Sequence, residues 1–251
     1  MYKNIIMKSI RDILDNYNVI GKALVIPTIL LLILNFASTS FTQADKNFTL
    51  GSLFFTFLSF IVDIVILITV HRILILGNES VPKWGLQKFE QREFSFFIKY
   101  FIIAIVFILV VVIITVCLQF IGIHIFAAIF LAMIICSIYI SRVSLVFPAI
   151  AVDTKMTFKD SLEYTKGFKL LIYVTVIIFP VLFSVVFGGI YALIITALAQ
   201  SISSHINILL VFLNVTISVF VVSALSNTYI YISESLSNQE VNEKYDEEDK
   251  N

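Results

Sequence analysis

Charge is scarce in this sequence, since Asp, Glu, Lys and Arg make up only 14% of its 251 residues. Soluble domains carry about 25% charged residues and about 45–50% apolar ones, whereas this chain is 59% hydrophobic with a mean hydropathy of +1.01. Water cannot solvate such a surface, so we expect lipid to surround most of the chain. The 17 basic and 17 acidic residues cancel, which argues against a nucleic-acid partner.

Cysteine and histidine are also rare. Cys117 and Cys136 fall in apolar runs on either side of a turn near Ile121, which separates them in depth by roughly 15 Å at about 1.5 Å per helical residue. A disulfide needs Cα atoms within about 7 Å, so we expect two free, buried thiols. The three histidines have no ligand spacing to a Cys or a carboxylate.

Sequence motifs of catalysis are absent as well. The chain has no phosphate loop, dinucleotide glycine pattern, zinc-protease motif or nucleophile elbow. The sequence therefore predicts no catalytic residue, no metal and no cofactor, and a protein that is not an enzyme.

Six long apolar runs are what the sequence has in abundance, and each is long enough to cross a bilayer as a helix. The expected spans are 19–37, 53–70, 101–120, 122–140, 168–199 and 206–232. We expect Pro180 to kink the fifth span. The four-residue stripe of Ser184, Gly188, Ala192 and Thr196 should let another helix approach closely. The fold class is thus all-α, a polytopic membrane bundle.

The positions of Lys and Arg predict how the spans are threaded. If both ends and the second and fourth loops lie on one side, sixteen of the 17 basic residues fall there and only Lys46 falls on the other. Such a bias marks the cytoplasmic side. We expect both termini in the cytoplasm and short amphipathic interfacial helices on that face.

The regions flanking the spans have their own patterns. In residues 1–18, Ile6, Ile10, Ile13, Leu14 and Tyr17 share one face at helical spacing, which is typical of a helix in the membrane interface. A docking helix for a partner protein is the alternative. Residues 19–232 form the six-helix transmembrane domain, and the acidic tail 233–251 is expected to be disordered.

The longest polar interruption in the second half of the chain runs from Ser141 to Lys169. Pro148 should end one helix, and Thr157-x-x-Asp160 has the capping-box spacing that begins another. Gly167 suits a helix end. The expected order is membrane helix, break, short surface helix, membrane helix.

Asp63 is the only acid within a span, and a mid-bilayer carboxylate costs about 2.5–3.5 kcal/mol on insertion scales. We expect it to face other helices, to be protonated or to be hydrogen-bonded. One hypothesis is a small proton- or cation-coupled secondary transporter, with Asn214 and Ser218, or Asn35, as partners of Asp63. The other is a single interhelical hydrogen bond.

The basic residues of the cytoplasmic side form a candidate rim for lipid headgroups. Its members are Arg72, Lys88, Arg92, Arg142, Lys159 and Lys166. Basic residues near a surface attract anionic headgroups by about 1 kcal/mol each. Membrane lipids are the predicted partners, no nucleic acid is expected, and the sequence names no protein partner.

A pattern in the polar interruption resembles known proteins. Arg142 is followed by Leu145, Pro148 and Ala149, and later by Phe158-x-x-Ser161-Leu162 and Gly167. This resembles the bacterial six-span membrane domain associated with glycerophosphodiester phosphodiesterases, and related inner-membrane families. The resemblance implies fold and location in the bacterial inner membrane over about residues 19–232. It does not imply the phosphodiesterase activity, because this chain lacks the catalytic domain.

These expectations converge on an integral membrane protein that is not an enzyme and that organises membrane lipids or a partner protein. The transporter that uses Asp63 is the alternative.

Overall fold

The computed structural model describes residues 1–45, 50–85 and 89–248, with the backbone alone for residues 42–45, 204 and 240–248. The described part is all-helical and contains six segments long and apolar enough to cross a membrane. They are Tyr17–Phe41, Leu50–Leu76, Gln91–Phe120, Ile125–Ala151, Lys169–Ser201 and His205–Gln239. The predicted all-α, multi-pass bundle is therefore confirmed.

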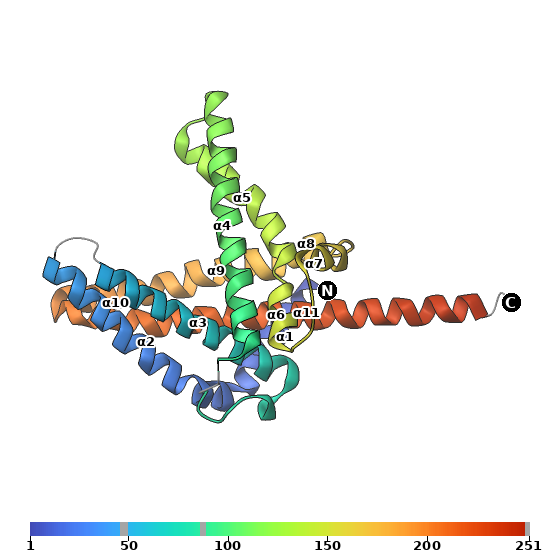
Figure 1. The fold of residues 1–251 in the computed structure, drawn as a ribbon, viewed down its shortest axis with the longest axis horizontal. Helices are drawn as coiled ribbons and strands as arrows, with labels where there is room; N and C mark the ends of the chain where they lie inside the picture. The colour runs from blue at the N-terminus through green and yellow to red at the C-terminus, as the bar shows by residue number, and fades with distance from the viewer. Residues whose placement is uncertain (46–49, 86–88, 249–251) are drawn as a thin grey trace.

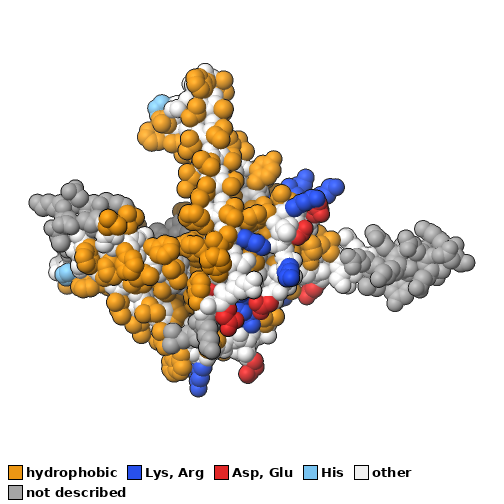
Figure 2. All heavy atoms as spheres, viewed as in Figure 1, with side chains coloured by type: hydrophobic (Ala, Val, Ile, Leu, Met, Phe, Trp, Pro, Cys, Tyr) orange, Lys and Arg blue, Asp and Glu red, His pale blue; other side chains and the backbone are white. Residues whose placement is uncertain are grey.

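The helices form two regions that meet at one end (Figure 1). The first region, here called the bundle, contains α1 (Tyr2–Asp15), α2 (Tyr17–Asp45) and α3 (Leu50–Leu76). It also contains η2 (Tyr173–Ile178), α9 (Phe179–Phe183), η3 (Ser184–Gly188), α10 (Gly189–Ser201) and α11 (Leu210–Glu248). The second is a hairpin of α4 (Gln91–Phe120) and α5 (Ile125–Val143), which projects away from the bundle at a steep angle. Charged side chains gather where the two regions meet, whereas both arms are covered by hydrophobic side chains (Figure 2).

Short elements fill the place where the regions meet. They are η1 (Asn78–Ser80), α6 (Val146–Ala151), α7 (Phe158–Tyr164) and α8 (Lys169–Ile172). The predicted capping box at α7 is present, since Asp160 N–H donates to the Thr157 hydroxyl and Thr157 N–H donates to Asp160. Pro148 does not end a helix as predicted: α5 already ends at Val143, and Pro148 lies in the first turn of α6, where its missing N–H costs no hydrogen bond.

The fifth span changes helical type on both sides of Pro180. It runs through α8, the π-helix η2 (Tyr173–Ile178), α9 (Phe179–Phe183), the π-helix η3 (Ser184–Gly188) and α10. Wider turns of this kind absorb the interruption that a proline makes in the backbone ladder. The small-residue stripe does admit a neighbour, because a Cβ added at Gly188 would lie 3.3 Å from Ile217 Cδ1 of α11.

Both ends of the chain are helical in the described residues, and the expected disorder of the tail is wrong there. Helix α1 buries Ile5 and Ser9 and leaves Leu14 exposed, and Tyr17, the first residue of α2, is exposed as well. Ser9 O accepts a hydrogen bond of 2.8 Å from Ser223 Oγ of α11, which docks α1 on the bundle. The segment 233–248, expected to be disordered, continues α11 as helix to Glu248 because the span has already nucleated that helix.

Three further details concern the start of α4, the two cysteines and two lysines that the structure does not describe. Helix α4 runs unbroken from Gln91 and begins with a capping box of Glu90 and Glu93. Of the two cysteines, Cys136 is buried and Cys117 is exposed, and both thiols are free. Lys46 and Lys88 lie outside the described residues.

Candidate functional site

Arg72 joins three segments at the foot of the hairpin. It lies near the end of α3, where Nη1 donates to Asp153 Oδ2 and to Ala151 O, both at 2.9 Å. Its Nε donates to Ser80 O at 3.1 Å. Ala151 is the last residue of α6, so its carbonyl has no partner within that helix and needs an outside donor. Arg72 thus ties α3 to α6 and to the turn after α3.

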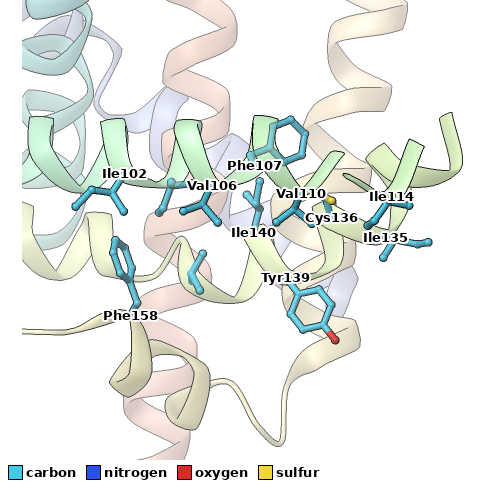
Figure 3. Close-up of a pocket in the computed structure, with 12 residues that line it drawn as sticks. Ile102, Val106, Phe107, Val110, Ile114, Ile135, Cys136, Tyr139, Ile140 and Phe158 are labelled. Carbon is cyan, nitrogen blue, oxygen red and sulfur yellow. The ribbon is translucent and has the colours of Figure 1, made fainter. Parts of the chain in front are cut away.

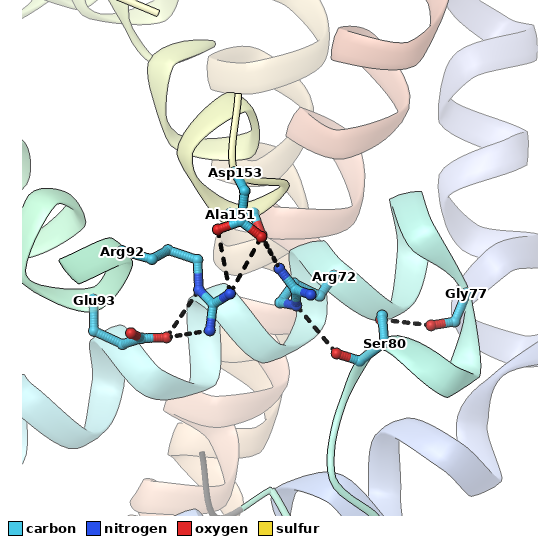
Figure 4. A network of polar contacts seen from close by, with 7 residues as sticks. All are labelled: Arg72, Gly77, Ser80, Arg92, Glu93, Ala151 and Asp153. Atoms are coloured by element: carbon cyan, nitrogen blue, oxygen red, sulfur yellow. Dashed lines mark hydrogen bonds and ion pairs between the residues drawn. The ribbon is translucent and has the colours of Figure 1, made fainter. Parts of the chain in front are cut away.

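Arg92 and Glu93 join the start of α4 to the same turn after α6. The Glu93 carboxylate is 1% exposed and accepts from Arg92 Nε at 2.9 Å and Nη2 at 2.7 Å. Its other oxygen accepts from Glu90 N–H at 2.9 Å, which completes the capping box. Arg92 Nη1 also reaches Asp153, at 3.3 Å. We call Arg72, Arg92, Glu93 and Asp153 the junction cluster (Figure 4).

Asp153 occupies a backbone conformation that usually belongs to glycine. Its φ is +61°, and Thr154 N–H donates to Ala149 O while Asp153 N–H donates to Ile150 O. This is the Schellman pattern that ends a helix, with Asp at the position where Gly is commonest. The contacts of its carboxylate explain why Asp rather than Gly stands at this position, because it accepts hydrogen bonds from both Arg72 and Arg92.

Arg142 makes a second polar contact, between α5 and α7. Its Nη2 donates to Leu162 O at 2.6 Å and its Nε donates to Thr165 Oγ1 at 3.2 Å. In return, Ser161 Oγ donates to Arg142 O at 2.6 Å. Three residues of the pattern that prompted the resemblance, Arg142, Ser161 and Leu162, are therefore in direct contact.

The candidate rim divides into two kinds of residue. Arg72, Arg92 and Arg142 are largely enclosed and hold protein groups, as the planar guanidinium favours. Lys159 and Lys166 are exposed, and Lys159 has only a 3.9 Å ion pair with exposed Glu163. The sequence analysis treated all rim residues alike, whereas in the structure Arg72, Arg92 and Arg142 bind protein groups and the two described lysines are exposed.

The residues proposed around Asp63 are not brought together. Asp63 is exposed on α3 and makes no hydrogen bond or ion pair with any described residue. Ser59, one turn earlier, donates to Phe55 O instead. On α11, Asn214 is exposed and Ser218 is half-buried. Asp63 therefore has neither Asn214 nor Ser218 as a hydrogen-bond partner, and α4 packs against α3 one turn before it, where Tyr100 contacts Phe60.

The buried polar residues of the bundle lie further along α11 than the sequence analysis placed them. Ser226 Oγ contacts His71 Nδ1 of α3 at 2.8 Å, and Thr228 Oγ1 contacts Thr175 Oγ1 of η2 at 2.9 Å. With Ser223, these residues join α11 to three other helices. The signal was visible as four polar residues within 223–228, inside the last apolar run. Polar contacts of this kind hold helices together in lipid.

A polar pocket of about 470 Å³ lies beside the junction cluster. It is lined by Gln91, Arg92, Ser95, Lys99, Ile150, Asp153, Thr154, Lys155, Met156, Thr157 and Asp160. Lys99 Nζ donates to Met156 O at 2.6 Å. The hydrogen bonds from Thr157, its backbone N–H first and its side chain second, hold the pKa of Asp160 below its ordinary value.

An apolar groove of about 400 Å³ lies between α4 and α5 (Figure 3). It is lined by Ile102, Ile103, Val106, Phe107, Val110, Ile114, Ile135, Cys136, Tyr139, Ile140, Val143 and Phe158. The sequence analysis missed both spaces. Their signal was the spacing of Arg92, Ser95, Lys99, Val106 and Val110, which puts these residues on one face of a helix.

Comparison with known proteins adds no relative. No protein-family model matches the chain, and neither a curated protein nor a solved structure matches it. The resemblance to the phosphodiesterase-associated membrane domain stays a prediction. Among the described residues, no three His, Cys, Asp or Glu side chains cluster as a metal site would require.

Proposed function

We propose that this chain is a multi-pass protein of the bacterial inner membrane, with both termini in the cytoplasm, that is not an enzyme and organises anionic lipids around its charged end. A partner protein that docks on the same end is the alternative occupant. The observation that carries the proposal is that the arginines and the lysines of the rim differ in their surroundings. The three arginines of the rim, Arg72, Arg92 and Arg142, bind groups of the protein, so the exposed lysines are the cations that remain available to lipid.

Eight lysines of the described residues are exposed and can contact lipid headgroups. They are Lys3, Lys8, Lys22, Lys83, Lys155, Lys159, Lys166 and Lys169. All lie on the side that the distribution of basic residues assigns to the cytoplasm. Acidic side chains lie among them (Figure 2), and before the tail 233–251 the assigned cytoplasmic side carries 14 Lys and Arg against 8 Asp and Glu. Each basic residue near an anionic surface contributes about 1 kcal/mol, which is enough for enrichment of anionic lipid without a dedicated site.

The only tryptophan offers a native probe for this proposal. Trp84 is 52% exposed in the turn before α4. Gly85, which follows it, approaches the Ala23 backbone of α2 so closely that a side chain would not fit. Trp84 is thereby held at the charged end of the bundle, where tryptophan suits the lipid interface.

The test is quenching of Trp84 fluorescence in proteoliposomes of the full chain. One sample contains brominated phosphatidylglycerol and its match contains brominated phosphatidylcholine at the same mole fraction. We expect stronger quenching by the anionic lipid, and a smaller difference at high salt because exposed charges are screened. Equal quenching by both lipids at low salt would overturn the proposal.

A further inference from the structure

We propose that one anionic glycerophospholipid binds across the polar pocket and the apolar groove, with its phosphate at Lys99 and Lys155 and an acyl chain between α4 and α5. This inference deepens the proposed function and rests on it. It differs from general enrichment at the charged end because it assigns a single molecule to a defined place.

The first argument is that the two spaces adjoin. Lys99 lines the pocket, and Ile102 and Ile103, one turn further along α4, line the groove. Thr157 borders the pocket and its neighbour Phe158 borders the groove, pointing toward α4 near Ile102 (Figure 3). One face of α4 therefore changes from polar to apolar along its length, as a phospholipid does.

The second argument concerns charge. Within the pocket, the Asp153 carboxylate is occupied by two arginines, and Asp160 accepts from Thr157 N–H. Lys99 and Lys155, in contrast, keep N–H donors that no group of the described residues uses. An ammonium has three N–H donors, of which Lys99 uses one on Met156 O, and Lys155 is exposed. Neither lysine forms an ion pair with a described residue. Three cations, Arg92, Lys99 and Lys155, and two carboxylates line the pocket, and both lysines keep N–H donors that fit a phosphate.

The third argument concerns length and depth. The groove extends from Ile102 to Ile114, which is about 18 Å along a helix axis at about 1.5 Å per residue. One leaflet is about half of a hydrocarbon core of about 30 Å, so the groove accommodates an acyl chain of that leaflet. Lys99, one turn before Ile103, then lies at the depth of the headgroup.

The experiment measures phosphatidylglycerol that stays bound to the full chain in detergent, by native mass spectrometry against added phosphatidylglycerol and phosphatidylcholine. We expect one phosphatidylglycerol per chain. Lys155→Gln should weaken binding about fivefold, the equivalent of one interfacial basic residue. Lys99→Gln should weaken it about tenfold, since a charge-assisted hydrogen bond is lost as well. Lys159→Gln, an exposed lysine outside the pocket, should change binding less than twofold.

A second pair of variants tests the groove without touching any charge. Val106→Trp should abolish the bound lipid by filling the groove. Val112→Trp, at an equally exposed α4 position outside the groove, should leave it bound. Because neither variant removes a polar contact, a folding defect in Lys99→Gln does not decide the result.

Each outcome separates this inference from the proposed function. Trp84 quenching that favours phosphatidylglycerol, without a one-to-one complex, overturns the specific site and leaves the general enrichment standing. Equal retention of phosphatidylcholine, or equal effects of Val106→Trp and Val112→Trp, also overturns the site. Loss of the Trp84 preference, with the complex intact, overturns enrichment around the charged end alone.

Discussion

The bundle and the α4–α5 hairpin differ in how their apolar helices are held to neighbouring helices. In the bundle, α11 is joined to α1, α3 and η2 by hydrogen bonds between buried side chains and backbone. In the hairpin, α4 leaves Ile108, Val112 and Ile113 between 53% and 60% exposed. The bundle also buries side chains toward its other end, such as Leu31 of α2 and Val211 of α11, whereas α4 beyond Phe101 buries only Thr115.

The difference follows from lipid as the solvent. Lipid tails are as apolar as leucine, so there is no hydrophobic driving force between apolar helices within a bilayer. Helices associate there where polar groups or close packing join them. At its foot the hairpin has both: the junction cluster, and aromatic contacts of Phe60 with Phe97 and Tyr100 at 5.7 and 5.2 Å. Beyond Phe101, α4 packs mainly against α5 and leaves large apolar side chains exposed.

The largest expected effect comes from removing the buried acid of the junction cluster. Glu93→Gln takes a carboxylate that is 1% exposed from Arg92 and from the α4 capping box. Breaking a buried ion pair on one side costs about 3 kcal/mol or more. The free energy of unfolding, measured by denaturant titration in lipid–detergent micelles, should fall by about that amount.

The matched control for Glu93 is Glu163→Gln. The ion pair of Glu163 with Lys159 is exposed on both sides, and such pairs contribute less than about 1 kcal/mol. An equal loss of stability in the two variants would contradict a special role for the junction cluster.

The next effect separates the charge of Asp153 from its backbone. Asp153→Gly loses the ion pairs of an exposed carboxylate, at about 1 kcal/mol. Asp153→Ala should cost about 1 kcal/mol more, because alanine does not tolerate the left-handed conformation. The same denaturant titration gives both values. Equal stability of the two variants would contradict backbone strain at the left-handed φ of +61°.

A smaller effect is expected within the bundle. Thr228→Val keeps the shape of the side chain and removes the hydroxyl contact with Thr175, which should cost about 0.6 kcal/mol, the average for such bonds in membranes. Thr216→Val is the control, because the exposed Thr216 hydroxyl bonds only to Phe212 O of its own helix. If the two variants unfold alike, the contact between α11 and η2 does not hold the bundle.

The smallest effect is a dependence on pH at the start of α7. The pKa of Asp160 is lowered by its bonds with Thr157, so its contribution to α7 is present above the ordinary pKa of about 4 and is lost as pH falls through the lowered value. Amide exchange in α7, corrected for intrinsic rates, should accelerate below about pH 4. Asp160→Asn should remove this dependence, and an unchanged profile in that variant would contradict the assignment.

Much of the fold could be predicted because it depends on local pattern. Long apolar runs gave the six spans, and Thr157 with Asp160 gave the start of α7. The contacts of Asp153 could not be predicted, since its partners lie 61 and 81 residues away and nothing in the local sequence pairs them. Asp63 is a different case. The sequence showed that an acid within a span is unusual, but it did not show which side chains surround that acid.

The difference between bundle and hairpin can be tested most directly by labelling the unmodified chain in proteoliposomes with a carbene reagent that partitions into the bilayer. Mass spectrometry then reads the labelled residues. Ile108, Val112 and Ile113 of the hairpin should label strongly, and Ile66, Ile68 and Val70 of α3, which are at most 1% exposed, should not. Protection of the three α4 residues to the level of α3 would mean that the hairpin packs against other helices, and would contradict its separation from the bundle.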